Sequence, residues 1–228
     1  NDVLFWNEDV GQELPGNMAY LINNNTRTKK IIIQKKQVYN KVINMLPDNK
    51  KDMVSYLGTI YPHDRLNKQR KNILIMTNSD QIERLKELVE NLEGFHFYIG
   101  ALTEMSSKLL AFDEYSNVTL YPSIVPEISE ELFKKCDIYL DINYGNEILG
   151  ITRVAFRENM LILGFDTTVH NRTFVAPENI YKPDLYMKMT DKIRHAFSDA
   201  DMLQDLLYRQ RVAADDETIP NYKKKLIK

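Results

Sequence analysis

The sequence predicts an α/β fold whose core is an open, doubly wound, Rossmann-like parallel sheet. Short apolar runs recur along the 228 residues, and amphipathic segments separate them. Several runs are continuous rather than alternating, which is typical of parallel strands that helices cover on both faces. Parallel neighbours need a crossover connection, and an α-helix usually supplies it. With 43% hydrophobic residues, the chain can bury one large core or two small ones.

Eight apolar runs are expected to form strands, because each has the length and composition of a buried strand. They are residues 3–6, 30–34, 53–60, 72–77, 95–100, 118–121, 138–142 and 160–165. Helical patterns lie between them. Ser79 and Asp80 are expected to cap a helix that carries one apolar stripe and ends at Gly94. Further helices are expected at residues 129–135 and 148–158.

After residue 165 the strands are expected to stop, and two closing helices follow. The first carries the stripe Leu185, Met189, Ile193 and Phe197. The second covers residues 199–213, and Ser198 is its expected cap. These helices either pack on the edge of the sheet or cross back to another domain.

Residues 62–71, PHDRLNKQRK, mark the expected domain boundary, because this stretch is polar and lacks apolar periodicity. We predict that residues 1–64 end an N-terminal Rossmann-like domain, that 65–71 form a linker, and that 72–228 form a C-terminal Rossmann-like domain with the closing helices. The first block has about three strands, too few for a complete α/β domain. Since the chain also begins with Asn1 rather than Met, we expect an upstream portion.

The charge balance argues against nucleic acid as a partner. The net charge is −2 and the pI is near 6.1, so the local groups of lysines are interpreted as a solvated face. The run Lys223, Lys224, Lys225 is a basic tail, and such tails also contact acidic lipid surfaces. The sequence has neither a membrane-spanning run nor a signal peptide, and its one cysteine, Cys136, favours a reducing compartment. We therefore expect a cytoplasmic protein, with peripheral membrane association as an addition.

The sequence lacks the motifs of several common kinds of catalytic, nucleotide-binding and metal-binding site. The four histidines have no close spacing to one another, to cysteine or to carboxylates, so no metal site is expected. The patterns GxSxG, GxGxxG and GxxxxGK[ST] do not occur, which removes the hydrolase, dinucleotide and P-loop interpretations. His170 lies among polar residues after a core strand, where it is either a general base or a hydrogen-bonding loop histidine.

Ligands of open α/β sheets bind at the carboxyl ends of the strands, so the loops after the strands are the candidate sites. Four loops qualify, at residues 78–80, 101–104, 144–147 and 166–172. The helix after Gly145 is expected to point its free N–H groups at this cleft, which suits an anion such as a diphosphate.

Residues 137–166 resemble the strand–loop–helix–strand segment with which many glycosyltransferases hold a nucleotide sugar. Such enzymes often carry two glutamates eight positions apart, and here those places fall on Asn146 and Val154. The loop at residues 78–80, where an arginine and a lysine often stand, supplies an aspartate that repels phosphate. This pattern indicates either a divergent enzyme or a relative that lost the chemistry. Glu147 takes the place of the ribose-binding acid if the register of the loop shifts by one.

Longer runs resemble one family throughout the chain. They are LFWNEDVGQELPGNMAYLI, ILIMTNSDQIERLKELVENL, HFYIGALTEMSSKLLAFDEYSNVTLYP, CDIYLDINYGNEIL and AFRENMLILGFDTTVHNR. The chain resembles the C-terminal half of GtfB, the chaperone-like stabilising subunits of the accessory Sec system. The resemblance implies a glycosyltransferase B-type architecture without transferase activity of its own. It also implies a catalytic partner, GtfA, which binds UDP-N-acetylglucosamine and transfers the sugar to Ser and Thr of a serine-rich repeat adhesin.

No catalytic residue, metal ligand or cofactor is carried over from the family. An extended Ser/Thr-rich acceptor offers hydroxyls and backbone groups, for which Asn, Glu, Tyr and His in a cleft are suitable partners. On that ground the predicted acceptor-binding or vestigial donor residues are Thr103, Glu104, Asn143, Tyr144, Asn146, Glu147, His170, Asn171 and Arg172. The alternatives are a retaining nucleotide-sugar glycosyltransferase that uses Glu147, and a module whose closing helices dock a partner.

Overall fold

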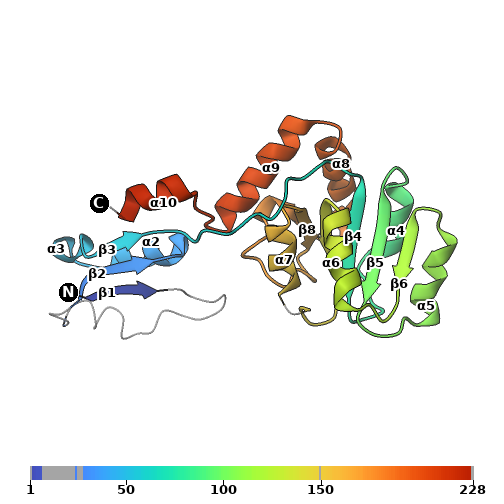
Figure 1. Cartoon of the computed structure of the whole chain (residues 1–228), viewed down its shortest axis with the longest axis horizontal. Coiled ribbons are helices and arrows are strands. Elements are labelled where there is room, and N and C mark those ends of the chain that lie inside the picture. Colours follow the sequence, from blue (N-terminus) through green and yellow to red (C-terminus); the bar gives the residue numbers. More distant parts are fainter. Residues whose placement is uncertain (1, 7–23, 25–27, 149, 227–228) are drawn as a thin grey trace. The chain divides into compact units, whose positions relative to one another are not determined.

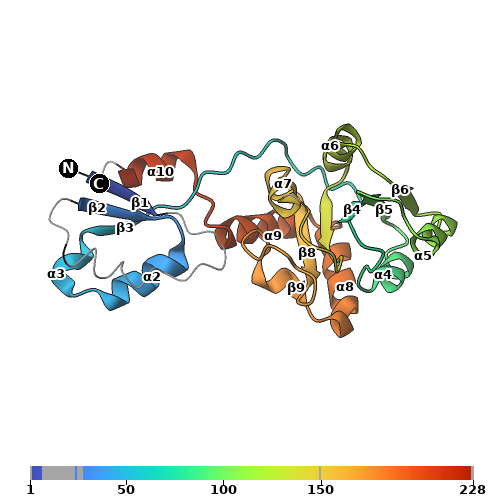
Figure 2. The same cartoon turned by 90° about the horizontal axis from the view of Figure 1, so that it is seen from below.

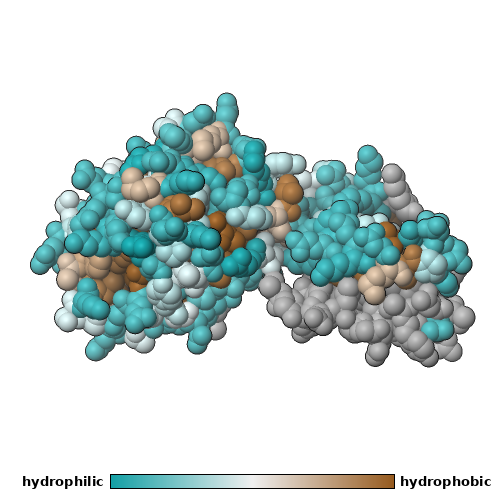
Figure 3. Space-filling view, turned by 180° about the vertical axis from the view of Figure 1, so that it is seen from behind, coloured by the Kyte–Doolittle hydropathy of each residue, from teal (hydrophilic) through white to brown (hydrophobic). Residues whose placement is uncertain are grey.

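A computed structural model describes residues 2–6, 24, 28–148 and 150–226 of the chain (Figure 1). Contacts between residues divide the chain into two compact units. One consists of Asn1–Tyr61 with Asp215–Lys228, and the other of Pro62–Ala214. Hydrophilic residues cover most of the face that Figure 3 shows, and small hydrophobic patches interrupt them.

The first unit is built on a three-stranded parallel sheet in the order β1-β2-β3. The strands are β1 (Asp2–Trp6), β2 (Thr28–Ile33) and β3 (Val54–Tyr56). Among the described residues of this unit, helices are formed by α2 (Lys36–Met45), α3 (Asp48–Lys51) and α10 (Ile219–Leu226). The buried core of this unit consists of Ile31, Ile33, Val42, Leu46 and Val54. Val42 belongs to α2, so this helix packs on the sheet through one apolar side.

The end of the chain is fixed to this unit by Asp215. Its carboxylate accepts a 2.7 Å hydrogen bond from the Tyr56 hydroxyl and bonds of 3.2 Å from the Lys36 amide. Its carbonyl accepts from the Thr59 amide at 3.0 Å. A Cβ at Gly58 would lie 2.3 Å from that carbonyl oxygen, so only glycine permits this approach. The sequence assigned residues 215–228 to the second domain, whereas their contacts group them with the first unit.

The second unit contains a six-stranded, wholly parallel sheet in the order β6-β5-β4-β7-β8-β9. The strands are β4 (Asn72–Thr77), β5 (His96–Ala101), β6 (Val118–Tyr121), β7 (Ile138–Asp141), β8 (Leu161–Phe165) and β9 (Ile180–Tyr181). The chain winds outward in one direction from β4 and then in the other from β7. The predicted doubly wound parallel sheet is thus confirmed, and its switch point lies between β4 and β7.

Helices cover the two faces of this sheet unequally (Figures 1 and 2). One face packs against α4 (Leu85–Asn91), α5 (Ser107–Leu110), α8 (Tyr186–Ala196) and α9 (Ala200–Ala213). The other face carries α6 (Pro126–Lys135) and α7 (Ile151–Arg157). Short 3-10 turns at Ala111–Glu114, Pro177–Asn179 and Pro183–Leu185 complete the unit. The apolar side chains of alternate strand positions, such as Ile73, Phe97 and Leu140, form the main core beneath the first group of helices.

Several local predictions were wrong at the ends of elements. Ser79 and Asp80 do not cap α4, because the Ser79 hydroxyl accepts from the Gln81 amide and the Asp80 carboxylate accepts from the Ser106 amide. Asp199 rather than Ser198 caps α9, and its side chain accepts from the amides of Asp201 and Met202. Strands also do not stop at residue 165, since β9 pairs with β8. This two-residue strand is too short to give a periodic signal.

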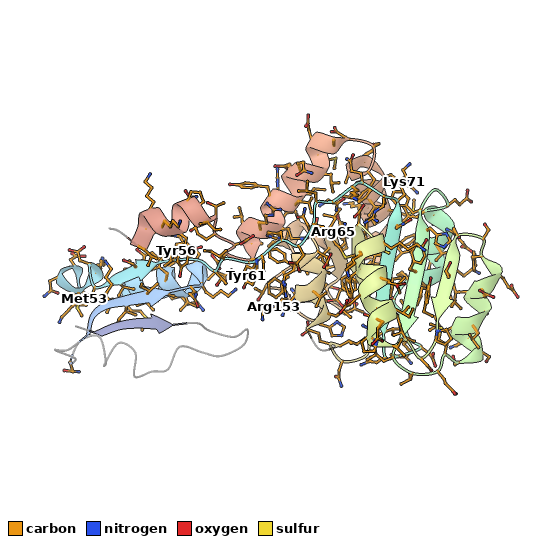
Figure 4. The ribbon with its side chains drawn as sticks, in the orientation of Figure 1. Met53, Tyr56, Tyr61, Arg65, Lys71 and Arg153 are labelled. Carbon is orange, nitrogen blue, oxygen red and sulfur yellow. The ribbon has the colours of Figure 1, made fainter. Side chains whose placement is uncertain are left out.

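Residues 62–71, which we call the strap, are bound to the amino end of β7 by a buried carboxylate. Arg65 and Arg70 both form ion pairs with Asp137, whose side chain is inaccessible to solvent. The amides of Lys68 and Arg70 donate to the same carboxylate at 3.2 and 2.7 Å. Arg65 lies beside α6 (Figure 4) and also pairs with Glu158 at 3.1 Å. Burial by itself would raise the pKa of Asp137, but hydrogen bonds from Arg70 and Arg65 outweigh it and hold the pKa below its ordinary value.

We expect Asp137→Asn to lower the free energy of unfolding by about 3–5 kcal/mol, because it removes the buried carboxylate that Arg65 and Arg70 share and leaves Glu158 as the only carboxylate paired with Arg65 among the described residues. Urea denaturation followed by circular dichroism measures this loss. Asp64→Asn is the matched control, since the Asp64–Arg157 pair is 44% and 42% exposed and should contribute less than about 1 kcal/mol. Equal losses in the two variants would show that the strap does not depend on the buried charge.

Candidate functional site

The candidate site lies at the carboxyl ends of β4 and β7, where the winding of the sheet reverses. The loops that follow these strands run side by side. Ile82 and Asn143 form an isolated antiparallel bridge, the Tyr144 amide donates to the Gln81 carbonyl at 3.0 Å, and the Glu83 amide donates to the Ile142 carbonyl at 2.8 Å. Main-chain pairing therefore narrows the opening between the loops.

Asn78 and Gly145 close this opening further. The Asn78 side-chain amide donates to the Asn146 carbonyl at 3.1 Å, which brings Asn78 against the backbone of Gly145. A Cβ at Gly145 would lie 1.6 Å from Asn78 Oδ1, so any larger residue at position 145 would displace the Asn78 side chain. The Gly145 amide already donates to Asn143 Oδ1 at 2.8 Å, and buried Asn143 donates to the Met76 carbonyl at 3.3 Å.

Asp141, the last residue of β7, holds His170 over the same loop. Asp141 is buried, and its carboxylate accepts from the His170 amide at 2.8 Å and from His170 Nδ1 at 2.6 Å. The other ring nitrogen, Nε2, lies 2.5 Å from the Gly145 carbonyl oxygen. The Thr168 hydroxyl donates to the Asp141 carbonyl at 2.9 Å. Loop residues 166–170 are thereby joined to the loop after β7.

This geometry selects the doubly protonated form of His170. A carbonyl oxygen only accepts, and a carboxylate accepts when ionised, so both ring nitrogens donate. The hydrogen bond to Asp141 is the main cause that raises the pKa of His170 above its ordinary value; burial opposes it, and the Gly145 carbonyl and the charge of Glu147 add to it. An imidazolium with both protons engaged cannot accept a proton, so His170 is a clamp for the loop rather than a general base.

Behind this clamp are polar atoms for which the described residues supply no hydrogen-bond partner. They are the Tyr139 hydroxyl, Glu147 Oε1 and the Thr152 hydroxyl. Tyr139 is fully buried, and burial followed by the charges of Asp141 and Glu147 raises its pKa well above the usual value. With Asp141 paired to the His170 imidazolium, the Glu147 carboxylate adds negative charge on this side of the loop, which disfavours phosphate.

The structure brings together part of the predicted set of site residues. The loop after β7 contains Asn143, Tyr144, Asn146 and Glu147. His170 follows β8 and contacts this loop at the Gly145 carbonyl. Tyr144 is 49% exposed and Asn146 is also exposed, so these two side chains are open to a ligand.

The remaining predicted residues lie elsewhere along the carboxyl edge of the sheet. Thr103 and Glu104 are exposed after β5, two strands from β7, and the Thr103 carbonyl accepts from the Ser123 amide at 3.0 Å. Asn171 Oδ1 accepts from the Thr173 amide at 3.1 Å, and exposed Arg172 donates to the Asp166 carbonyl at 3.2 Å.

The helix end that was expected to face the loops with free N–H groups differs from the prediction. The helix expected from residue 148 begins at Ile151 instead, and it has only seven residues. The amides of Tyr144 and Gly145 already donate to groups of the protein, so they are not free for an anion. Val154, at one of the two places of the missing glutamates, is an apolar side chain 39% exposed on α7. Among the described residues, no group of His, Cys, Asp and Glu is arranged to bind a metal.

Asp141 was not among the site residues predicted from the sequence. The sequence did contain a sign of its role, since Asp141 is a charged residue at the carboxyl end of an apolar strand. A charged side chain is buried in such a place only when it has a partner. The partner, His170, follows 29 residues later and becomes visible only in the fold.

We expect the contribution of the Asp141–His170 clamp to stability to be lost at alkaline pH. The folded-state pKa of His170 is raised, so this contribution is fully present below the unfolded value of about 6.5 and declines as pH rises through the folded pKa. The difference in unfolding free energy between the wild type and His170→Gln should accordingly shrink with rising pH. A difference that stays constant or grows would contradict the imidazolium assignment.

Known protein families match both units of the chain. The GftB/GlyA-F C-terminal domain family matches residues 73–210, and the GtfB third domain matches residues 1–45. The chain is 45% identical over 225 residues to the UDP-N-acetylglucosamine–peptide N-acetylglucosaminyltransferase stabilizing protein GtfB of Limosilactobacillus reuteri subsp. suis, covering 98% of this chain and 51% of the relative. The protein of the same name from Streptococcus agalactiae is 45% identical over 223 residues, with coverage of 97% and 50%. The chain thus spans about half the length of the curated relatives it matches.

Comparison with solved structures confirms the glycosyltransferase B-type fold. A crystal structure of a GtfA/B complex bound to UDP and GlcNAc aligns with a TM-score of 0.90 at 38% identity, covering 99% of this chain and 51% of the other. TarM aligns with a TM-score of 0.54 at 12% identity, covering 99% of this chain and 49% of TarM, which supports the fold alone.

Proposed function

Because this chain belongs to the GftB/GlyA-F C-terminal domain family, we propose that it is part of a noncatalytic GtfB-type subunit of a protein O-glycosyltransferase. In this proposal the subunit binds the acceptor polypeptide and stabilises and activates a catalytic GtfA-type partner. The partner binds UDP-N-acetylglucosamine and transfers the sugar to Ser and Thr of a serine-rich repeat adhesin before accessory Sec export. Residues 1–64 are proposed to end a domain that precedes the linker.

The closed switch point is the observation that carries the noncatalytic part of the proposal. A nucleotide-sugar site at this place needs free backbone donors or cations for the diphosphate. Here Asn143 Oδ1 occupies the Gly145 amide, the Gln81 carbonyl occupies the Tyr144 amide, and the Glu147 carboxylate adds negative charge near the clamp. These features favour a neutral, hydroxyl-bearing ligand over a diphosphate.

The acceptor is proposed to contact the exposed side of the same edge. Tyr144 and Asn146 are exposed there, and Thr103 and Glu104 extend the polar surface beyond β5. Amide, hydroxyl and carboxylate groups pair with serine hydroxyls and with the main chain of an extended polypeptide. His170, Asn171 and Arg172 belong to this proposed surface through the loop that the clamp positions.

Isothermal titration calorimetry tests this proposal with two ligands. We expect no measurable heat with UDP-N-acetylglucosamine and measurable binding of an unmodified serine-rich peptide. Tyr144→Ala should weaken peptide binding by about tenfold, as expected for loss of an exposed aromatic contact. Tyr208→Ala is the control, since Tyr208 is a 66% exposed tyrosine on α9, away from these loops.

The competing enzyme hypothesis makes the opposite prediction for the same titration. If Glu147 binds the ribose of a donor, the wild type binds UDP-N-acetylglucosamine and Glu147→Ala does not. Tight donor binding that depends on Glu147, or sugar transfer by the purified subunit alone, would overturn the noncatalytic proposal.

Peripheral membrane association is a second proposal, and α10 favours it. This helix carries Lys223, Lys224 and Lys225, and its apolar residues Ile219 and Leu226 are 56% and 51% exposed. In the described part of the chain, no helix has the length and apolar character to cross a membrane.

We expect the protein to co-sediment with vesicles rich in phosphatidylserine and to be released by salt. The charge variant Lys223→Gln/Lys224→Gln/Lys225→Gln should lose most of this binding, while Lys86→Gln on α4 should keep it. Equal sedimentation with uncharged phosphatidylcholine vesicles would contradict an electrostatic contact.

A further inference from the structure

The two hydrogen bonds of the His170 ring require that the ring carry two protons. Its Nδ1 lies 2.6 Å from the Asp141 carboxylate, and its Nε2 lies 2.5 Å from the Gly145 carbonyl oxygen. Both partners are acceptors, and a neutral imidazole has only one N–H to donate. When the ring gives one proton to the solvent, one of the two contacts therefore loses its hydrogen bond and brings two acceptor atoms against each other.

The contact with Gly145 is the one that is lost. Asp141 is buried, so its carboxylate needs the Nδ1 proton more than a backbone carbonyl needs the Nε2 proton. Two further bonds, which do not involve the ring, also keep this loop on β7. The His170 amide donates to the Asp141 carboxylate at 2.8 Å, and the Thr168 hydroxyl donates to the Asp141 carbonyl at 2.9 Å. The ring thus stays with β7, and Gly145 is the partner that separates.

Residues 145–147, which we call the loop tip, are the part of the loop after β7 that the His170 ring holds. The residues before the loop tip are fixed by main-chain hydrogen bonds to Gln81 and Glu83. Within the loop tip, the Asn146 carbonyl accepts from Asn78, but this hydrogen bond is exposed, so water can replace it. The contact with His170 is part-buried and is therefore the firmer of the two.

The closed position of the loop tip leaves a buried polar atom unpaired. Glu147 Oε1 is inaccessible to solvent and has no hydrogen-bond partner in the described part of the chain, and the same holds for the hydroxyls of Tyr139 and Thr152. Unpaired buried polar atoms cost free energy. A movement that brings Glu147 to water is therefore favoured once the contact with His170 is lost. The proton on His170 holds the loop tip closed against this opposing cost.

The groups that face His170 place the loss of its proton above the usual histidine range. The hydrogen bond to Asp141 raises the pKa of His170 most, burial opposes it, and the Gly145 carbonyl and the charge of Glu147 raise it further. Tyr139, on the same strand as Asp141, is neutral because its own pKa is raised well above the usual value. Arg172, in the loop of His170, donates to the Asp166 carbonyl at 3.2 Å. The ring therefore stays protonated through the ordinary titration near pH 6.5.

We propose that the Asp141–His170 clamp is a pH-sensitive device, which holds the loop tip closed while the ring carries two protons and releases residues 145–147 to solvent when one proton leaves. The alkaline loss of stability expected for the clamp then begins as a local opening of this loop. The inference goes beyond the proposed function and does not depend on it, since it concerns hydrogen bonds within the second unit alone.

NMR of the full chain from about pH 5 to about pH 10 tests the device. The nitrogen shifts of the His170 ring report its titration, and the amide shifts of residues 145–147 report the loop tip. We expect one common midpoint above about 6.5 and no change at that midpoint in the amides of β4, which separates local opening from unfolding. In His170→Gln the loop-tip amides should lose this midpoint.

Two carboxylate variants test the cause of the midpoint. Glu147→Gln should lower it, because the variant removes a negative charge that raises the pKa of His170. Glu93→Gln is the control and should leave it unchanged, since Glu93 is exposed and lies between α4 and β5, at the amino end of the strands.

Three results would overturn the device. One is a titration of the His170 ring that leaves the loop-tip amides unchanged. Another is a loop-tip midpoint that persists in His170→Gln, or that Glu147→Gln fails to lower. The third is a change in the β4 amides at the same midpoint, because the opening would then not be local. Since Glu147→Gln keeps His170 and Asp141 in place, its midpoint decides the matter even if His170→Gln does not fold.

Discussion

A buried carboxylate at each end of β7 determines how the second unit is assembled. Asp137 precedes the strand and Asp141 ends it, and both side chains are inaccessible to solvent. An unpaired charge in such a place is strongly unfavourable, so each must recruit partners from elsewhere in the chain. Asp137 recruits Arg65 and Arg70 and thereby fixes the strap, while Asp141 recruits His170 and thereby fixes the loop after β8. One strand of four residues thus ties together segments that are far apart in sequence.

The second of these charge pairs also determines the chemistry of the switch point. With both ring protons of His170 engaged by Asp141 and Gly145, the loop after β7 is held against Asn78. The amides of Tyr144 and Gly145 in this loop donate to groups of the protein, whereas related folds bind phosphate with free backbone amides. These satisfied amides support the proposal of a noncatalytic subunit.

The sequence was sufficient for the parts of the fold that depend on periodic apolar burial. The strands at residues 72–77 and 118–121 were predicted with their observed bounds, because continuous apolar runs report burial on both faces. The caps were harder to predict, since Ser79, Asp80 and Ser198 each have several hydrogen-bonding partners within reach. The Asp141–His170 and Asp137–Arg65 pairs join residues 29 and 72 positions apart. No local pattern encodes such pairs, so their roles follow only from the topology of the sheet.

The amide of Gly145 offers the most direct measurement of the central claim, that the switch point is closed by the protein's own hydrogen bonds. Its resonance can be followed by NMR, in hydrogen exchange and during titration with UDP-N-acetylglucosamine. We expect slow exchange, because the amide donates to Asn143 Oδ1, and no change in chemical shift at saturating nucleotide sugar. Rapid exchange, or a shift of this resonance that saturates with the nucleotide sugar, would contradict it.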